Sequence, residues 1–336
     1  MSLRRGAGAR SARIVVLGDL VLDIVARGDG PLEPASDVSG TVRFRAGGSA
    51  ANTARTFVRL GGRATFIGAV GQDHWARRLT AAMRAEGVVV HAVAVSHPTA
   101  RLVALIRPDG ERSFLVERGA ADALDAADLD QAWFRACDLL HLPGYSLFTH
   151  PLAGAAMRGA AIAQGRGALL SVDLSSRAPL LAMGRRRAWQ ILTELRPTIV
   201  FGNGGEVAAL TGERQEERLL RVAPIVVVKE GVAGCRVLAR AGDSAEVLRL
   251  TVATPRIAAR DTTGAGDAFD AGFLLSMLKQ SGRGSAPSGA SSQSGGSAPS
   301  GATLPRDAGS LRRAAVAGHR AAGALLRLPR SDLPDR

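Results

Sequence analysis

Cysteine and lysine are both scarce in this sequence of 336 residues. Its 2 cysteines, Cys137 and Cys235, cannot build a disulfide scaffold or a cysteine-rich zinc site, and they indicate reduced thiols in a cytoplasmic protein. The 6 histidines are scattered without metal-ligand spacing, which argues against a catalytic zinc centre. Lysine occurs only at Lys229 and Lys279, so arginine supplies nearly all of the positive charge.

Long apolar runs are also missing, and aromatic residues make up only 4% of the chain. The most apolar early stretch, residues 14–25, is interrupted by Asp19 and Asp23 and falls short of the roughly 20 residues that a membrane span needs. The N-terminal arginines have no apolar region beside them, so no secretory signal is expected. The net charge is +13, but the arginine runs lack the interleaved aromatics that stack on bases. We therefore expect neither a membrane nor a nucleic acid as the main partner.

The rest of the chain has the pattern of an α/β protein. Short apolar runs alternate with helical patterns, and this alternation predicts a doubly wound, mostly parallel sheet with helices on both faces, a three-layer architecture. The expected strands of this sheet are 13–18, 64–68, 139–142, 168–173, 198–202 and 225–229. The expected helices are 47–60, 73–86, 150–164, 179–195, 214–222, 267–279 and 310–327.

Two segments are predicted to lie outside this core. Residues 1–12 are small and basic, and we expect a disordered tail. Residues 280–309 consist largely of Ser, Gly, Ala and Pro, so they are expected to form a flexible insertion between two helices. The remaining residues, 13–336, would then form one domain that contains this insertion.

The most informative motif is Asp261-Thr-Thr-Gly-Ala-Gly-Asp-Ala-Phe269, which leads into an apolar helix. Gly264, Ala265 and Gly266 would expose backbone N–H groups at the helix start, where the helix dipole favours an anion. Asp267 in the same turn would repel a phosphate, so its better role is a base that takes a proton from an attacking hydroxyl. The combination indicates phosphoryl transfer to an alcohol, although an N-capping Asp after a glycine turn is the plainer alternative.

Two further groups lie near the first strand. Gly47, Gly48 and Asn52 begin a helix where a small ligand could approach closely and meet an amide. Asp19 and Asp23 follow the first strand, at the edge where open α/β sheets bind ligands. A carboxylate there suits sugar hydroxyls.

These motifs, in this order and spacing from about residue 13 to 334, resemble the ribokinase-like (PfkB) family of carbohydrate kinases. The resemblance implies transfer of a phosphoryl group from ATP to a primary alcohol, with Asp267 as base and the amides of residues 264–267 as anion hole. It also implies residues that bind the acceptor (Asp23, Gly47, Gly48, Asn52), a Mg²⁺ and phosphate motif acting through water (Asn203, Glu206) and a nucleotide loop (Lys229, Gly231, Gly234).

The resemblance further implies a small β lid formed by segments of about 24–45 and 99–117, whose closure would exclude water from the site. A homodimer through this lid is expected from the same comparison. Family members often need a monovalent cation, and Asp261 would help to hold K⁺ here.

The acceptor is left open by the sequence. Arg118 and Arg177, the latter in Asp173-Leu-Ser-Ser-Arg177, resemble segments of fructokinases and 2-keto-3-deoxygluconate kinases, and two arginines would suit a carboxylate. Pro143-Gly144 and Ser49 depart from ribokinases. We expect a fructose- or ketodeoxygluconate-like sugar first, then ribose, then a nucleoside such as adenosine or pseudouridine. A non-catalytic sugar-binding regulator on the same fold is the alternative from another class.

Overall fold

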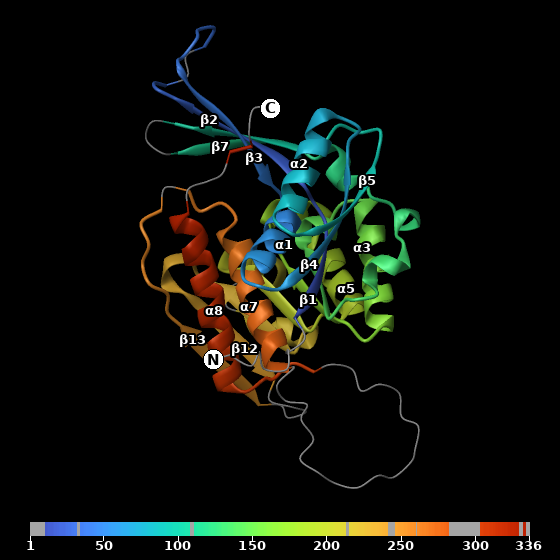
Figure 1. Cartoon of the computed structure of the whole chain (residues 1–336). Helices are drawn as coiled ribbons and strands as arrows, with labels where there is room; N and C mark the ends of the chain where they lie inside the picture. The colour runs from blue at the N-terminus through green and yellow to red at the C-terminus, as the bar shows by residue number, and fades with distance from the viewer. Residues whose placement is uncertain are drawn as a thin grey trace, which may run out of the picture.

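The computed structural model describes residues 11–31, 34–107, 111–212, 215–240, 246–259, 261–281, 303–328 and 332–333. Within these ranges the chain forms a nine-stranded main sheet and a separate four-stranded sheet (Figure 1). The main sheet has the strand order β13-β12-β11-β10-β9-β8-β1-β4-β5. Its strands are β1 (Arg13–Leu17), β4 (Arg63–Val70), β5 (Val89–Ala94), β8 (Leu139–Pro143), β9 (Leu169–Asp173), β10 (Ile199–Asn203), β11 (Ile225–Lys229), β12 (Cys235–Arg240) and β13 (Val247–Val252).

The main sheet is parallel from β5 to β11, and β12 and β13 pair antiparallel at one edge. Helices cover both faces, as Figure 1 shows, which confirms the predicted α/β architecture. The helices are α1 (Ser49–Arg59), α2 (His74–Ala85), α3 (Leu152–Gly165), α4 (Arg177–Met183), α5 (Arg185–Leu195), α6 (Gly204–Thr211), α7 (Ala265–Ser281) and α8 (Ala308–Arg327). Short 3-10 turns are η1 (Gly119–Asp122), η2 (Ala126–Asp128), η3 (Gln131–Phe134), η4 (Gly144–Ser146), η5 (Glu216–Arg221) and η6 (Gly231–Ala233). No helix of the described residues is long and apolar enough to cross a membrane.

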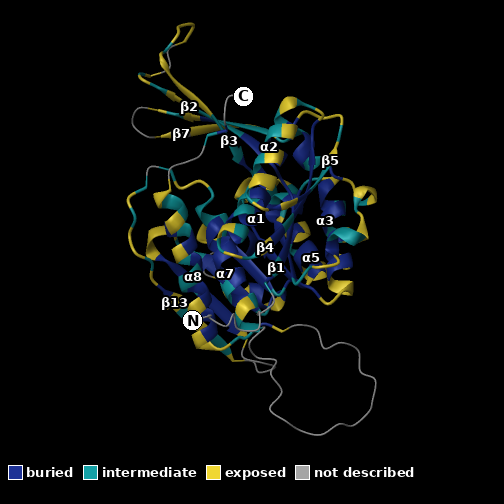
Figure 2. Ribbon diagram, in the orientation of Figure 1, coloured by how far each residue is buried: buried dark blue, intermediate teal, exposed yellow. Residues whose placement is uncertain are grey.

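Two hydrophobic clusters, one on each face of the main sheet, pack the two helix layers against it. Alternate residues of β1 point to opposite faces: Ile14 and Val16 join the cluster with α1, α2, α7 and α8, whereas Val15 and Leu17 join the cluster with α3, α5 and α6. Burial on both faces explains why the central strands read as continuous apolar runs in the sequence. In Figure 2 the buried residues, coloured dark blue, lie in the interior between the main sheet and its helices.

The smaller sheet has the order β3-β2-β6-β7, with strands β2 (Val21–Gly28), β3 (Gly40–Gly47), β6 (Arg101–Ile106) and β7 (Arg112–Glu117). It uses both segments that the sequence assigns to a lid, and it projects beyond the main sheet (Figure 1). Several apolar side chains of its strands are exposed, including Val42, Phe114 and Leu115 (Figure 2).

Several boundaries differ from prediction. The helix expected over residues 179–195 is two helices, because Gly184 adopts φ 91° between them. The pattern at 214–222 forms only the 3-10 turn η5, and β5, β12 and α6 were not predicted, because short apolar runs carry little periodicity.

The described ends of both segments that were expected to be flexible belong to the folded core. Ala12 is buried, and its carbonyl accepts a hydrogen bond from Arg63 N, whereas residues 1–10 lie outside the described ranges. Residues 280–281 belong to α7, Leu304 is 6% exposed, and Asp307 caps α8. Only residues 282–302 of the predicted insertion lie outside the described residues.

Candidate active site

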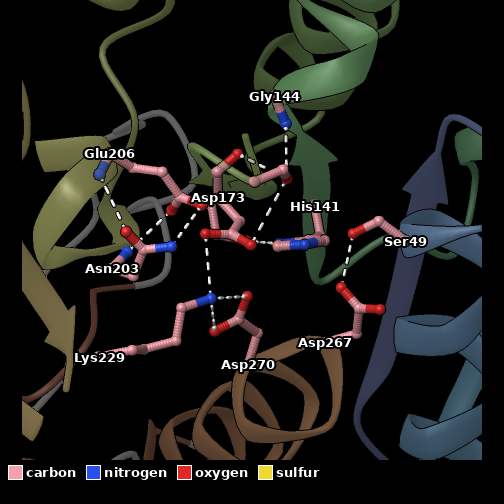
Figure 3. A network of polar contacts seen from close by, with 11 residues as sticks. Ser49, His141, Gly144, Asp173, Asn203, Glu206, Lys229, Asp267 and Asp270 are labelled. Atoms are coloured by element: carbon pink, nitrogen blue, oxygen red, sulfur yellow. Dashed lines mark hydrogen bonds and ion pairs between the residues drawn. The ribbon is translucent and has the colours of Figure 1, made fainter. Parts of the chain in front are cut away.

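The carboxyl ends of β8, β9, β10 and β11 converge on the N-terminus of α7 (Figure 3). Gly264 adopts φ 74°, which turns the chain sharply into the helix and requires glycine. The first N–H groups of a helix have no partner within it, so they can bind an anion. Ala265 N–H donates to the carbonyl of Thr262 at 3.1 Å and is therefore occupied within the turn.

Asp267 is held by two side chains from α1. Ser49 Oγ donates to Oδ1 at 2.6 Å and Asn52 Nδ2 donates to Oδ2 at 2.9 Å. Burial raises the pKa of Asp267 to about 6, although both hydrogen bonds favour the charged form. A carboxylate with a pKa near neutrality is suited to accept a proton. Asn52 was predicted as a ligand of the acceptor; its observed partner is Asp267.

Asp23 lies beside Gly47, which faces Val21 in the β2–β3 ladder. A methyl group at Gly47 would lie 2.2 Å from Asp23 Oδ2, so only glycine leaves room for this carboxylate. Burial, with the nearby charges of Asp19 and Asp261, raises the pKa of Asp23 to about 7. Asp23 and Gly47, both predicted to bind the acceptor, therefore lie side by side.

Gly48 has φ 101° and leads into α1. The carboxylate of Asp19 caps the helix, because Oδ1 accepts from Ala50 N at 3.0 Å. Arg118 donates to Asp19 Oδ2 at 3.0 Å and to Asp122, and its guanidinium lies 4.9 Å from the ring centre of Tyr145. Arg118 thus holds the carboxylate of Asp19 in the position where it caps α1.

A cavity of about 640 Å³ opens between the smaller sheet, α1 and α8. Its polar lining includes Asp23 and Asn52, and Asn52 also hydrogen-bonds Asp267. Gly264, in the turn before Asp267, lines it as well. Apolar side chains supply another part of the lining. The residues of this apolar wall are Val25, Ala46, Leu102, Ala104, Phe114, Val116, Leu325 and Leu328.

The two arginines expected to bind a carboxylate do not meet in this cavity. Arg118 contacts Asp19 and Asp122, and Arg177 lies against α6, where its Cδ would be 3.3 Å from a methyl group on Gly205. Neither is among the residues that line the cavity. Arg55 and Arg59 line it instead, and both are paired with Glu86.

Asn203 and Glu206 form a reciprocal cap at the start of α6. Asn203 Oδ1 accepts from Glu206 N at 2.9 Å, while Glu206 Oε2 accepts from Asn203 N at 2.8 Å. Burial and the neighbouring Asp173 raise the pKa of Glu206 to about 7. The predicted Asn-x-x-Glu pair is therefore rigid and faces the same region as Asp173.

Lys229, predicted as part of the nucleotide loop, has two carboxylate partners that the sequence did not indicate. Its Nζ lies 3.1 Å from Asp173 Oδ1 and 3.2 Å from Asp270 Oδ2 (Figure 3). The sequence carried one signal for Asp270: it lies one helical turn after Asp267, so both side chains are on the same face of the helix.

His141 on β8 is fully buried and shares a hydrogen bond with Ser171 Oγ. Burial lowers the pKa of His141 to about 4.

The predicted nucleotide loop forms the turn between β11 and β12. Gly231 and Gly234 adopt φ 57° and 103°, and a methyl group at Gly234 would lie 2.2 Å from the carbonyl oxygen of Val252. Glycine is therefore required at Gly234, where the chain passes close to β13.

Asp261, the expected ligand of a monovalent cation, faces an arginine. Arg45 Nη1 lies 3.3 Å from Asp261 Oδ2, and Arg45 Nε lies 3.0 Å from Asp332 Oδ1. A guanidinium thus bridges the loop before α7 and the C-terminal segment. No group of three or more His, Cys, Asp or Glu side chains in the described residues is arranged to hold a metal ion.

Residues 11–298 match the pfkB family of carbohydrate kinases. The chain belongs to this family. Fructokinase-1 of Oryza sativa subsp. japonica is 32% identical over 284 residues, which cover 81% of this chain and 84% of that protein. Membership of the family makes the chain a sugar kinase.

Two solved structures show the same fold. Adenosine kinase from Sinorhizobium meliloti superposes with a TM-score of 0.72 at 24% identity and covers 96% of this chain and 97% of its own. Aminoimidazole riboside kinase from Salmonella enterica, solved with aminoimidazole riboside and an ATP analogue, has a TM-score of 0.69 at 21% identity and 96% coverage of both chains. The predicted ribokinase-like architecture with a small β lid is thereby confirmed.

Proposed function

We propose that this sugar kinase transfers the phosphoryl group of ATP to a primary hydroxyl of a small neutral sugar of the fructose type. The observation that carries the proposal is the carboxylate of Asp267, which lies partly buried at the N-terminus of α7 and accepts a hydrogen bond from Asn52, a residue that also lines the cavity. A base and an anion-binding helix start are thus adjacent to a space for the acceptor.

In this mechanism the acceptor lies in the cavity with its hydroxyls near Asp23. Asp267 accepts the proton of the attacking hydroxyl as the acceptor oxygen bonds to phosphorus and the bond to the leaving ADP oxygen breaks. The amides of Gly264, Gly266 and Asp267 face the transferred group. Closure of the smaller sheet would keep water, a competing acceptor, out of the cavity.

Mg²⁺ fits the residues beside this site. Glu206 is a single carboxylate at a helix start, and Mg²⁺ usually keeps several waters and binds through one or two carboxylates together with phosphates. Asn203 and Glu206 would therefore hold Mg²⁺ through water. When bound, the ion would neutralise developing charge on the phosphates.

The cavity favours a neutral sugar over a sugar acid. Arg118 and Arg177 lie outside its lining, and the arginines that do line it, Arg45, Arg55 and Arg59, have carboxylate partners. The relative from rice, named a fructokinase, supports the same choice. A nucleoside is the second candidate, because the apolar wall with Phe114 could cover a flat base.

The remaining expectations concern location and assembly. A cytoplasmic location agrees with the reduced cysteines, and a homodimer would cover the exposed Val42, Phe114 and Leu115 of the smaller sheet. Both stay proposals.

The test is ADP release with Mg²⁺ and ATP across fructose, ribose, 2-keto-3-deoxygluconate and adenosine at equal concentrations. We expect the highest kcat/KM with fructose. A preference for adenosine would support the second candidate, and a preference for ketodeoxygluconate would contradict the argument from the arginines. ATP binding without phosphorylation of any acceptor would favour a regulator.

A further inference from the structure

A partly buried lysine, Lys229, lies against the N-terminal turn of α7. Lys229 ends β11, its side chain is 15% exposed, and its Nζ would lie 3.3 Å from a methyl group on Gly266. The ammonium group is therefore next to the backbone that begins the helix. Figure 3 shows it between Asp173 and Asp270, to the left of Asp267.

Two buried carboxylates fix this ammonium. Asp173 comes from β9 and is 5% exposed, and Asp270 comes from α7 and is fully buried. Both oxygens of Asp270 lie 3.2 Å from Nζ. Three carboxylate oxygens therefore lie within 3.2 Å of Nζ, but the two from Asp270 belong to one carboxylate and can share one of the three N–H donors. With one N–H directed to each carboxylate, the third is left for another acceptor.

A purely stabilising role explains the arrangement poorly. Burying ions costs several kcal/mol each, and apolar side chains in place of a buried ion pair are often as stable or more so. This chain also uses arginine almost everywhere and places one of its 2 lysines here. Lysine is a compact point charge, which fits beside a glycine turn where the wide guanidinium fork would not.

We propose that Lys229 belongs to the phosphoryl-transfer site: held by Asp173 and Asp270, its ammonium donates its third N–H to the phosphoryl group during transfer. The inference rests on the proposed function, in which this group binds at the start of α7. Lys229 keeps all its protons; the proton of the acceptor goes to Asp267, and the broken bond leaves ADP. Asp270 is a positioning residue that acts through Lys229.

The test compares full-length variants in which the charge is removed. Lys229→Met/Asp270→Leu removes both members of the pair, and Lys229→Gln keeps an N–H donor without the charge. Lys279→Met is the matched control, because Lys279 is the other lysine and is exposed near the end of α7. Urea unfolding gives the stability of each, and ADP release with the best acceptor gives kcat and KM.

A second readout needs no acceptor. Fluoroaluminate bound together with MgADP mimics the phosphoryl group during its transfer. The affinity of the enzyme for fluoroaluminate therefore reports on the anion site at the start of α7 without any acceptor. We expect both Lys229 variants to fold, to bind MgADP within about threefold of wild type, and to lose about 10²- to 10³-fold in kcat with little change in acceptor KM. Fluoroaluminate affinity should fall in parallel, and Lys279→Met should match wild type.

A folded Lys229 variant with kcat and fluoroaluminate affinity within about threefold of wild type would overturn the proposal. Failure of both variants to fold would also overturn it, because the pair would then be structural. If none of the acceptors is phosphorylated while fluoroaluminate binding still depends on Lys229, the proposed function fails and the assignment of Lys229 stands.

Discussion

Ser49 Oγ lies 2.6 Å from Oδ1 of Asp267, so the first residue of α1 hydrogen-bonds the carboxylate in the first turn of α7. The two residues are 218 positions apart in the chain. This contact joins the helix that lines the acceptor cavity to the helix that begins the anion site. It also gives a role to Ser49, one of the residues at which this chain departs from ribokinases.

The first prediction concerns pH. Because the pKa of Asp267 is raised to about 6, kcat should fall as pH decreases through that value, where the carboxylate takes up a proton and can no longer accept one. Ser49→Ala removes a donor that favours the charged form and should move this acid limb to higher pH. ADP release between pH 5 and 8 measures both. Ser276→Ala on α7 serves as control, and an unchanged limb in Ser49→Ala would refute the coupling.

The second prediction concerns the space beside Asp23. Gly47→Ala should displace this carboxylate, because the added methyl group would lie 2.2 Å from its Oδ2. We expect the acceptor KM to rise by about tenfold or more, as hydrogen bonds to the acceptor are lost, while MgADP binds as in wild type. Gly154→Ala in α3 is the matched control, since nothing lies within 4 Å of its new methyl group. Equal acceptor KM values for the two variants would remove Asp23 from the acceptor site.

The third prediction concerns monovalent cations. The Arg45 guanidinium lies between Asp261 and Asp332, where it supplies positive charge that K⁺ would otherwise bring. Replacing Na⁺ with K⁺ at constant ionic strength should therefore change kcat by less than about twofold. A strong activation of the wild-type enzyme by K⁺ would show that the cation binds elsewhere or displaces Arg45.

The fourth prediction concerns residues 282–302. Gln280 of α7 donates to the carbonyl of Ser310 in α8, so the helix ends on either side already lie together. Replacing 282–302 with a short glycine-serine linker should leave activity unchanged and the free energy of unfolding within about 1 kcal/mol. Extending the deletion through Leu304 should destabilise the protein, because that side chain is 6% exposed. Thermal unfolding distinguishes the two deletions.

The sequence predicts the elements with strong local signals. Apolar runs bounded by glycine correspond to β1, β4 and β8–β11, and Asp73 caps α2 as expected. Regular periodicity also predicts α1 and α8, and the apolar run that follows the glycine motif predicts α7. Short elements such as β5 and β12 were missed, since a few apolar residues fit a strand, a helix or a loop equally well.

The motifs predicted which residues belong to the candidate site, and the structure showed which side chains they contact. Asp267 lies in the first turn of α7, Asp23 lines the cavity, and Asn203 and Glu206 cap α6, while their roles as base, acceptor ligand and Mg²⁺ motif stay predictions. The partners of Lys229 were not visible, because Asp173 and Asp270 reach it from elements far apart in the chain. Arg118 was predicted to bind a carboxylate of the acceptor, but it does not line the cavity. The sequence does not reveal whether an arginine already pairs with a carboxylate of the protein, as Arg118 does with Asp19 and Asp122.

The central claim is that Asp267 is the base that deprotonates the acceptor. Its most direct test is single-turnover ADP formation by Asp267→Asn, which keeps the shape of the side chain, with MgATP and the best acceptor. The account predicts a rate roughly 10²- to 10⁴-fold below wild type with ATP affinity nearly unchanged. A rate close to that of wild type would contradict it.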